Sequence, residues 1–324
     1  MDRIGSNLKF VRHAAVATLF AGIAAAGWGQ TKLIPLEAGG RVVARYEPGA
    51  APMKPYVKEL FSPAGVEVTV DSPPDHFHHH GLMFAIGAGD TDFWTEKPFE
   101  KNGRQVPRAG TTVAAPGGVK QTVDWLGTNG APLLVEARSV RVATVAGGPN
   151  LVTWISELRP AGKDAVRLWG RHYFGLGLRF VPDLNGERIA WIFREGTPEG
   201  RLVRGDERVR PAAWAAATGT IGGKPVTLAM WGGSRDECGA TEWFTMTKPF
   251  SYLAATLDLE NHPRLLAAGE TLALRYGVAV FDGAAGAAEI CNACQTWLAA
   301  EEAVGKRTGE APWKRRAAPS KRPD

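Results

Sequence analysis

The sequence predicts an all-β protein, a large antiparallel β-sandwich of two sheets with one C-terminal helix. Apolar and polar residues alternate over many short segments, most clearly over 134–142 and 272–281, and this alternation is typical of strands with one buried face. Turn residues such as Gly222-Gly223 separate the segments. One segment, 287–304, instead repeats its apolar residues at helical spacing. A parallel α/β fold is not expected, because its crossovers need helices between the strands.

Short apolar or alternating runs between turn residues predict the remaining strands. These are expected over 32–36, 41–46, 57–61, 66–70, 82–86, 118–126, 151–158, 167–174, 177–181, 188–194, 213–221, 226–231 and 253–259. Asn185-Gly186 predicts a type I′ hairpin turn, because both of its residues tolerate positive φ. The predicted helix carries one apolar stripe that would pack against a sheet, formed by Ile290, Ala293, Cys294, Trp297 and Leu298.

The first 29 residues have the three parts of a secretory signal peptide. Basic residues come first, an apolar run extends from Ala14 to Ala26, and small residues flank Trp28. The run is too short to predict a membrane span. We therefore expect a periplasmic or secreted mature protein without a membrane span, in which 1–29 is removed and 30–305 forms a single β-sandwich domain.

The formal net charge of +5 suggests nucleic-acid binding, but the positive charges lie at the two ends of the chain. Residues 306–324 carry a net +5 and residues 1–29 a net +2, which leaves −2 for the body. The segment 306–324 is rich in Pro, Ala, Lys and Arg, as is typical of a disordered basic tail. The slightly acidic body argues against a nucleic-acid partner.

The three cysteines say little about structure or function. Cys291 and Cys294 form a C-x-x-C pair inside the predicted helix, and Cys238 stands alone. In an exported protein the pair could be an oxidised disulfide. Two core cysteines are the other interpretation, and nothing around the pair indicates redox function.

The heptapeptide at 75–81 reads Asp-His-Phe-His-His-His-Gly and holds four of the seven histidines. Histidine titrates near neutrality and is the commonest metal ligand, so proton transfer and metal binding are both open. If the segment is extended, His76, His78 and His80 share one face and could bind one divalent metal ion. A structural hydrogen-bond network is the third interpretation.

In a metal-free enzyme the same segment would supply the catalytic residues. His76, His78 or His79 would transfer a proton, Asp75 would orient one of the rings, and Arg179 would stabilise developing negative charge. Substrate-binding candidates are Glu67, Trp94, Arg171 and His172. The tryptophan is included because its flat face and N–H suit a sugar ring.

Several stretches also carry a family resemblance. They are Lys54-Pro55-Tyr56, residues 60–69 (LFSPAGVEVT), residues 73–85 (PPDHFHHHGLMFA), Asp92-Phe93-Trp94 and residues 173–180 (YFGLGLRF). In this order they cover most of the body, and together they resemble the bacterial PmoA-like family, which carries a legacy methane oxygenase label. The most specific part is the Asp-His-x-His-His-x-Gly-Leu core.

The resemblance implies an exported protein from bacteria that degrade complex carbohydrates, with a β-sandwich fold of galactose-mutarotase-like type. Family members usually have Arg at position 80 and Pro at position 77, where this chain has His80 and Phe77. A metal triad that needs His80 would therefore not be shared by the family, which leaves 75, 76, 78 and 79 as the common core. Methane oxidation is not expected, because the body has no stretch of 18 apolar residues.

These observations predict an exported protein that acts on a small-molecule or oligosaccharide ligand through its Asp/His cluster. The reaction would be of hydrolase, lyase or epimerase type. The alternative is a non-catalytic module that binds carbohydrate or metal.

Overall fold

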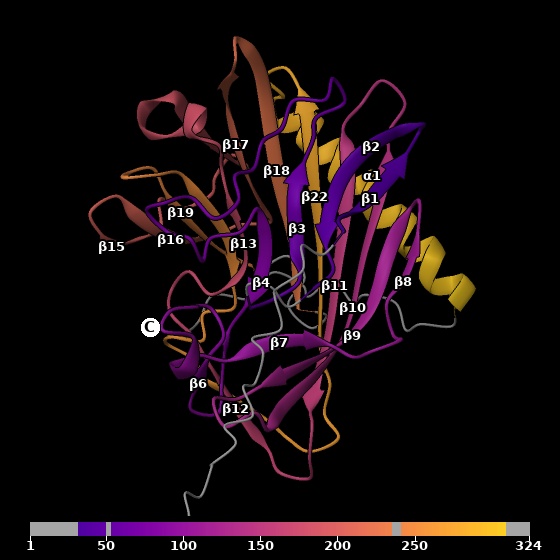
Figure 1. The fold of residues 1–324 in the computed structure, drawn as a ribbon. Helices are drawn as coiled ribbons and strands as arrows, with labels where there is room; N and C mark the ends of the chain where they lie inside the picture. The colour runs from indigo at the N-terminus through magenta and orange to yellow at the C-terminus, as the bar shows by residue number, and fades with distance from the viewer. Residues whose placement is uncertain (1–31, 50–52, 235–240, 309–324) are drawn as a thin grey trace, which may run out of the picture. The chain divides into compact units, whose positions relative to one another are not determined.

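The computed structural model describes residues 32–49, 53–234 and 241–308. The predicted signal peptide, most of the predicted tail and Cys238 lie outside these ranges. The described chain forms two large antiparallel sheets, one small sheet and one α-helix (Figure 1). The prediction of an antiparallel β-sandwich with one C-terminal helix is confirmed.

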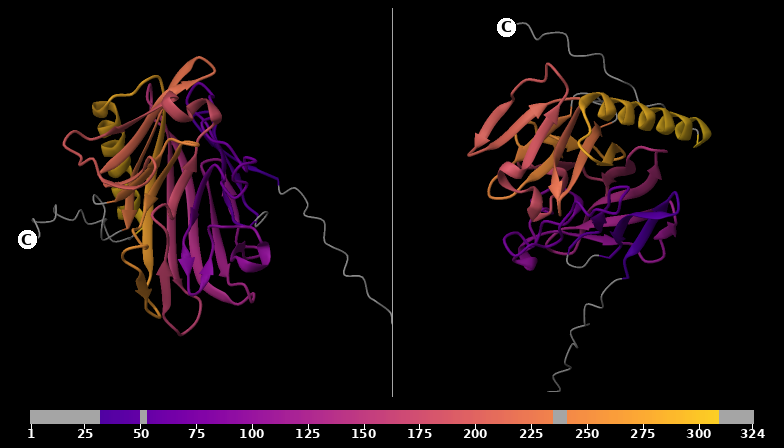
Figure 2. Two further views of the ribbon diagram at one scale, coloured as in Figure 1. Left: turned by 90° about the vertical axis from the view of Figure 1, so that its left-hand side faces the viewer. Right: turned by 90° about the horizontal axis from the view of Figure 1, so that it is seen from above.

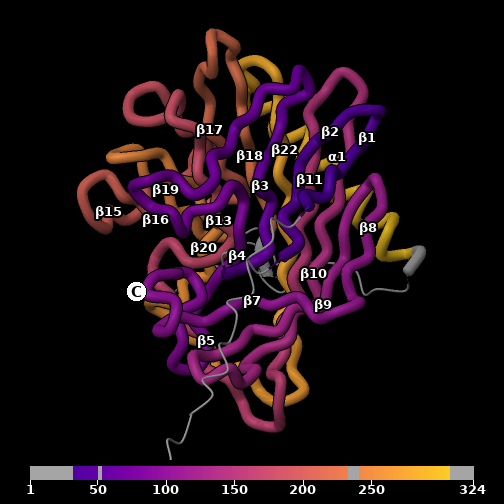
Figure 3. The backbone as a smooth tube through the Cα atoms, in the orientation of Figure 1, coloured from indigo at the N-terminus to yellow at the C-terminus, as the bar shows by residue number. Residues whose placement is uncertain are grey.

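The first large sheet has nine strands, and it carries the strands that matter for the candidate site. In spatial order they are β1 (Ile34–Ala38), β2 (Arg41–Glu47), β3 (Tyr56–Leu60), β4 (Leu82–Ala85), β13 (Gly175–Arg179), β20 (Tyr252–Thr256), β19 (Glu242–Met246), β16 (Glu207–Pro211) and β15 (Arg201–Arg204). The backbone tube shows β3, β4 and β13 side by side (Figure 3). Segments from the two halves of the chain are therefore neighbours in this sheet.

The second large sheet and the small sheet complete the β-structure. The second sheet runs β14 (Ile189–Phe193), β17 (Trp214–Ile221), β18 (Lys224–Ser234), β22 (Leu272–Asp282), β11 (Asn150–Pro160), β10 (Pro132–Thr144), β9 (Gly118–Leu126) and β7 (Arg104–Pro107), with β8 (Val113–Ala115) also paired to β9. The small sheet runs β21 (Arg264–Leu266), β12 (Val166–Trp169), β5 (Gly87–Ala88) and β6 (Thr91–Asp92). Three 3-10 turns are η1 (Phe99–Lys101), η2 (Pro182–Leu184) and η3 (Gly186–Arg188).

Both faces of β22, near the middle of the second sheet, are buried, and successive residues of this strand pack on opposite faces. On β22, Val278 and Val280 belong to the main core, whereas Ala279 and Phe281 face the other way. The helix α1 (Ala287–Thr308) covers that other face, and it lies on the side of the molecule away from the indigo strands (Figure 2). Trp297 of α1 is buried there and donates from Nε1 to Thr153 Oγ1 over 2.8 Å.

The helix begins where it was predicted and ends at Thr308, so the first residues of the predicted tail are helical. Cys291 and Cys294 lie on this helix and pack against the apolar cluster beneath it, as expected for core cysteines. No helix in the described ranges is long and apolar enough to cross a membrane.

Three local predictions are wrong for physical reasons. The run 66–70 forms isolated bridges rather than a strand. The strand predicted over 167–174 ends at Trp169, and a turn closed by Phe174 N and Arg171 O follows it. Asn185-Gly186 does not form a hairpin turn, because β13 before it and β14 after it belong to different sheets.

Candidate functional site

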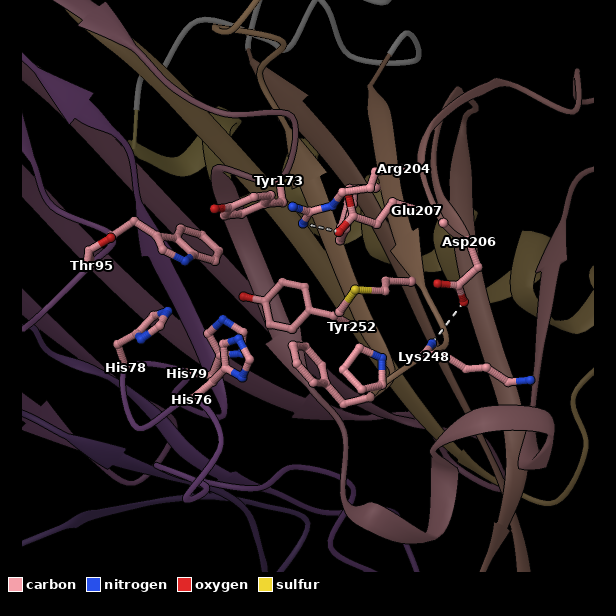
Figure 4. A pocket seen from close by; sticks show the side chains of 16 residues that line it. His76, His78, His79, Thr95, Tyr173, Arg204, Asp206, Glu207, Lys248 and Tyr252 are labelled. Carbon is pink, nitrogen blue, oxygen red and sulfur yellow. Dashed lines mark hydrogen bonds and ion pairs between the residues drawn. The ribbon is translucent and has the colours of Figure 1, made fainter.

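A cavity of about 510 Å³ lies over β20, β19, β16 and β15 of the first sheet. The loop between β3 and β4 and the loop after β6 supply one wall of this cavity. The lining residues are His76, His78, His79, Trp94, Thr95, Tyr173, Arg204, Gly205, Asp206, Glu207, Phe244, Met246, Lys248, Pro249, Phe250 and Tyr252. The three histidines lie together on one side and Arg204, Asp206 and Glu207 on the other, with Tyr252 between (Figure 4).

Strand register explains why these side chains share one face of the sheet. Tyr252 is the cross-strand partner of Arg179 on β13 and of Met246 on β19. Phe244 is two residues from Met246, so it points to the same face, and it pairs with Val209 on β16. The rigid sheet thus aligns residues that lie far apart in the sequence.

The histidine segment is not extended, which corrects the geometry on which the predicted metal triad depended. His76 N donates to Pro73 O over 3.0 Å, and His79 N donates to His76 O over 2.8 Å, so two tight turns follow each other. Side chains three residues apart overlie one another in such turns. His76 and His79 accordingly stack with ring centroids 4.8 Å apart, and His78 lies 4.6 Å from His79 and 5.6 Å from His76.

His80 is separated from the other three histidines. Its side chain is fully buried, with Nδ1 at 2.7 Å from Asp71 Oδ1 and Nε2 at 2.9 Å from Glu96 Oε1. Glu96 also accepts from the buried Lys54 Nζ over 2.6 Å. Because both ring nitrogens face carboxylates, His80 is part of a structural ion network and does not join a triad with His76 and His78.

Asp75 and Arg179 form the base of the histidine group. Arg179 Nη2 donates to Asp75 Oδ2 over 2.8 Å, and the guanidinium lies 3.5 Å from the ring centroid of Phe250. Asp75 Oδ2 is 3.3 Å from His76 Nδ1, and Arg179 Nη1 is 3.4 Å from His79 Nδ1. Burial opposes ionisation of Asp75, but the hydrogen bond and charge of Arg179 outweigh it and lower the pKa of this carboxyl.

The environment keeps two of the cavity histidines neutral at neutral pH. Burial, followed by the charge of Lys54, lowers the pKa of His78 to about 4. Burial and the neighbouring His78 and His76 lower the pKa of His79 well below its ordinary value. A neutral imidazole has one nitrogen with a lone pair and one with a proton, so each ring can accept and donate a hydrogen bond.

Aromatic side chains form the floor and one wall of the cavity. Asp92 Oδ1 accepts from the backbone N–H groups of Trp94 and Thr95, and this turn fixes Trp94 next to the histidines. Trp94 stacks on Phe174 with ring centroids 5.1 Å apart. The predicted candidate Trp94 therefore lines the cavity, but it is almost fully buried and Phe174 covers one of its two faces.

The opposite wall is built around an ion-paired carboxylate. Glu207 accepts from Arg204 Nη2 over 2.6 Å at one oxygen, and its other oxygen is 3.0 Å from His172 Nε2. His172 Nδ1 is 3.2 Å from Glu260 Oε2. The predicted candidate His172 thus does not line the cavity but positions Glu207, which does.

Two predicted binding residues lie elsewhere. Glu67 is exposed on the bridge to Phe61, and Arg171 is exposed in the turn before Tyr173, so neither lines the cavity. Within the described ranges, no group of three or more His, Cys, Asp or Glu side chains is arranged to hold a metal ion.

Residues that sequence reasoning missed include Glu207, Tyr252 and Phe250. Glu207 follows the turn at Gly205 between two charge-rich strands. A glycine between two such segments could have predicted a hairpin here. Tyr252 and Phe250 carry no local signal, because only the pairing of β20 with β13 brings them to the histidines.

One family comparison covers most of the chain. Residues 34–295 match a protein family that is described as a family of unknown function (DUF6807). No curated protein matches the chain. Because the match spans well over half of the sequence, the chain belongs to the DUF6807 family.

Proposed function

We propose that this protein binds a carbohydrate in the cavity and transforms it by histidine acid–base chemistry, as a hydrolase, lyase or epimerase does. The observation that carries the proposal is the group of three mutually contacting histidines on one side of an aromatic cavity. A volume of about 510 Å³ falls within the range of small-molecule sites.

The character of the walls supports a sugar as the ligand. Sugars present apolar C–H faces and hydroxyl edges, which suit aromatic side chains beside polar groups. Here Tyr173, Phe244 and Phe250 provide apolar surface, while the histidines and Glu207 provide polar groups. The neutral His78 can both donate and accept a hydrogen bond, which suits the hydroxyl groups of a sugar.

The location of the protein is part of the proposal. The signal-peptide pattern in residues 1–29 supports export to the periplasm or beyond, where oligosaccharides would be available. The resemblance to the PmoA-like family supports the same setting, since that family occurs in bacteria that degrade complex carbohydrates.

Calorimetric titration with oligomers of glucose, galactose, mannose, xylose, glucuronate and galacturonate tests the proposal, followed by product analysis for each sugar that binds. We expect at least one sugar to bind and to be converted. His78→Asn should abolish conversion with folding intact, because it removes one of the three imidazoles from the cavity. His262→Asn is the matched control, since His262 is an exposed histidine outside the cavity.

Each outcome has a distinct meaning. Binding without conversion would favour the non-catalytic carbohydrate-binding module. Absence of binding across the panel would contradict the proposal. Loss of conversion in His262→Asn as well would mean that the effect of His78→Asn is not specific to the cavity.

A further inference from the structure

We infer that Asp75 and Arg179 hold the stacked rings of His76 and His79 in opposite tautomers. His76 then presents a lone pair from Nε2, and His79 presents an N–H from Nε2. The inference deepens the proposed function and rests on it, because it assigns different roles to two histidines of the same cavity. It narrows the three reaction types to those that begin with removal of a proton from the sugar.

The tautomer of His76 follows from its carboxylate neighbour. Asp75 Oδ2 lies 3.3 Å from His76 Nδ1 and 2.8 Å from the Arg179 guanidinium, so the carboxylate is ionised and can only accept. His76 Nδ1 therefore carries the proton. In the neutral ring this leaves Nε2 with its lone pair, and the adjacent carboxylate stabilises the imidazolium that forms when Nε2 accepts a proton.

The tautomer of His79 follows from a cation in the same way. Arg179 Nη1 lies 3.4 Å from His79 Nδ1, and a guanidinium has donors but no acceptor. His79 Nδ1 must therefore be the unprotonated nitrogen, which places the proton on Nε2. Burial lowers the pKa of His79 well below its ordinary value, so the ring stays neutral at neutral pH.

The two assignments depend on one rigid ion pair. Arg179 is buried, packs on Phe250 and uses separate nitrogens for Asp75 and His79. The imidazole planes are 24° apart, so the two rings lie nearly parallel in the cavity wall. Arg179, a single residue of β13, thus determines the hydrogen bonding of both His76 and His79.

The resulting chemistry balances with no further reactant other than water. A proton passes from a C–H of the sugar, next to a carbonyl or carboxylate, to Nε2 of His76. The electron pair of that C–H bond stays on the sugar as an enolate, and the His79 Nε2–H donates to the oxygen that gains the negative charge. Protonation of the opposite face of that carbon by water, while His76 releases its proton to solvent, completes an epimerisation. Departure of a β-oxygen substituent as an alkoxide that takes up the proton from His76 completes an elimination.

Hydrolysis fits this arrangement less well. A glycosidase needs an acid that gives its proton to the leaving oxygen. Neutral His79 could do so only by becoming an imidazolate, so it serves as a hydrogen-bond donor, as a neutral histidine does in triosephosphate isomerase. Lyase and epimerase chemistry therefore remain as the expected classes.

The tautomers can be read by NMR on the intact, ¹⁵N-labelled protein at pH 7. Two-bond correlations to the ring nitrogens should show protonated Nδ1 for His76 and protonated Nε2 for His79. The exposed His262, whose Nε2 lies 3.4 Å from Asp258 Oδ2, does not line the cavity, so its shifts should stay the same in every variant and serve as the internal control. The same tautomer in both rings, or averaging in either, would overturn the inference.

Two variants test whether Asp75 and Arg179 determine these tautomers. In Asp75→Ala, the ring-nitrogen shifts of His76 should become averaged between its two tautomers, while those of His79 should not change. The Asp75 side chain is 46% exposed, so the variant should fold. In Arg179→Met, the ring-nitrogen shifts of His79 should become averaged. If this variant fails to fold, Arg179→Lys serves instead, because a single ammonium group cannot reproduce the contacts that Arg179 makes with Asp75 and His79 through two nitrogens. Unchanged tautomers in folded variants would refute the role of this ion pair.

The chemical step has its own readout in D₂O. With a glucuronate or galacturonate oligomer that binds, the C–H signal next to the carboxylate should decay as deuterium enters. His76→Asn should slow the exchange by about 100-fold or more, in the range typical of a lost general base. Binding and conversion without C–H exchange would overturn this inference but leave the proposed function standing, whereas absence of sugar binding would overturn the proposed function itself.

Discussion

Gly177 leaves the space that the phenol of Tyr252 occupies in the cavity floor. A Cβ at position 177 would lie 2.7 Å from Cζ of Tyr252, closer than any normal contact. Gly177 pairs with Ala254 on the neighbouring strand, and Tyr252 is two residues from Ala254, so the ring reaches diagonally across the strand pair. The glycine therefore shapes the cavity without lining it.

Replacing Gly177 with Ala should displace this ring. We expect the free energy of unfolding to fall by about 1–3 kcal/mol, the usual cost of overpacking a core, with weaker sugar binding. Urea denaturation and calorimetry measure the two effects. Adding Tyr252→Phe should restore part of the stability, because the hydroxyl that clashes is gone and has no partner among the described residues. Equal losses in the single and double variants would contradict the explanation.

Among the charged residues near the site, Lys54 should contribute most to the free energy of unfolding. It is fully buried between Glu96 Oε1 and Trp94 O, at 2.6 and 3.2 Å. Lys54→Met should lower the free energy of unfolding by about 3 kcal/mol, at the lower end for a broken buried pair because His80 still contacts Glu96. Arg108→Met breaks the exposed pair with Asp124 and should cost at most about 1 kcal/mol. Similar losses in both variants would show that burial is not the cause.

The stability of the protein should fall as the pH decreases from 6.5 towards 4. The pKa of His78 is about 4 when folded and near 6.5 when unfolded, so in this window the unfolded chain binds the extra proton. His79 acts in the same direction. Urea denaturation at pH 7.5, 5.5 and 4.5 measures the slope, which His78→Asn should flatten.

The exposed Gln295, whose side chain does not titrate, provides the control for this slope. Gln295→Ala should leave the pH dependence as in the unmodified protein. The buried carboxyls contribute below this window, since the pKa of Glu96 is lowered to about 2. A slope that His78→Asn does not change would contradict the assignment to the cavity.

Trp297→Ala should loosen the helix from the second sheet. The ring is buried against Trp231, with centroids 6.1 Å apart, and its N–H donates to Thr153. We expect a loss of about 3–5 kcal/mol, as for other large core truncations. Hydrogen exchange should show faster exchange in α1 than in β22. The exposed Gln295→Ala on the same helix should change neither quantity.

The strand pattern was largely predictable because burial on one face imposes period two on the sequence. The segment 118–126 was predicted and β9 spans Gly118–Leu126. The charge-rich strands β15 and β16 were missed, since β15 is largely exposed and shows little apolar alternation. Turn chemistry also misled at Asn185-Gly186, where local preference could not reveal that the chain changes sheets.

The candidate site was only partly predictable. The density of histidines marked 76, 78 and 79 correctly as cavity residues. The prediction that residues 76, 78 and 80 share one face was wrong, because the segment forms two tight turns and is not extended. Residues of the opposite wall depend on strand order, which sequence spacing does not contain.

The contact between Asp75 and Arg179 joins positions 104 residues apart, and the cavity also needs Tyr252. No fragment that ends before β20 can hold a complete cavity, so a ligand should have no affinity for the unfolded or partly folded chain. Binding and folding are therefore thermodynamically linked. A ligand at 100 times its dissociation constant should add about 2.7 kcal/mol to the free energy of unfolding, which makes a rise in melting temperature a direct search tool for the sugar that this cavity accepts.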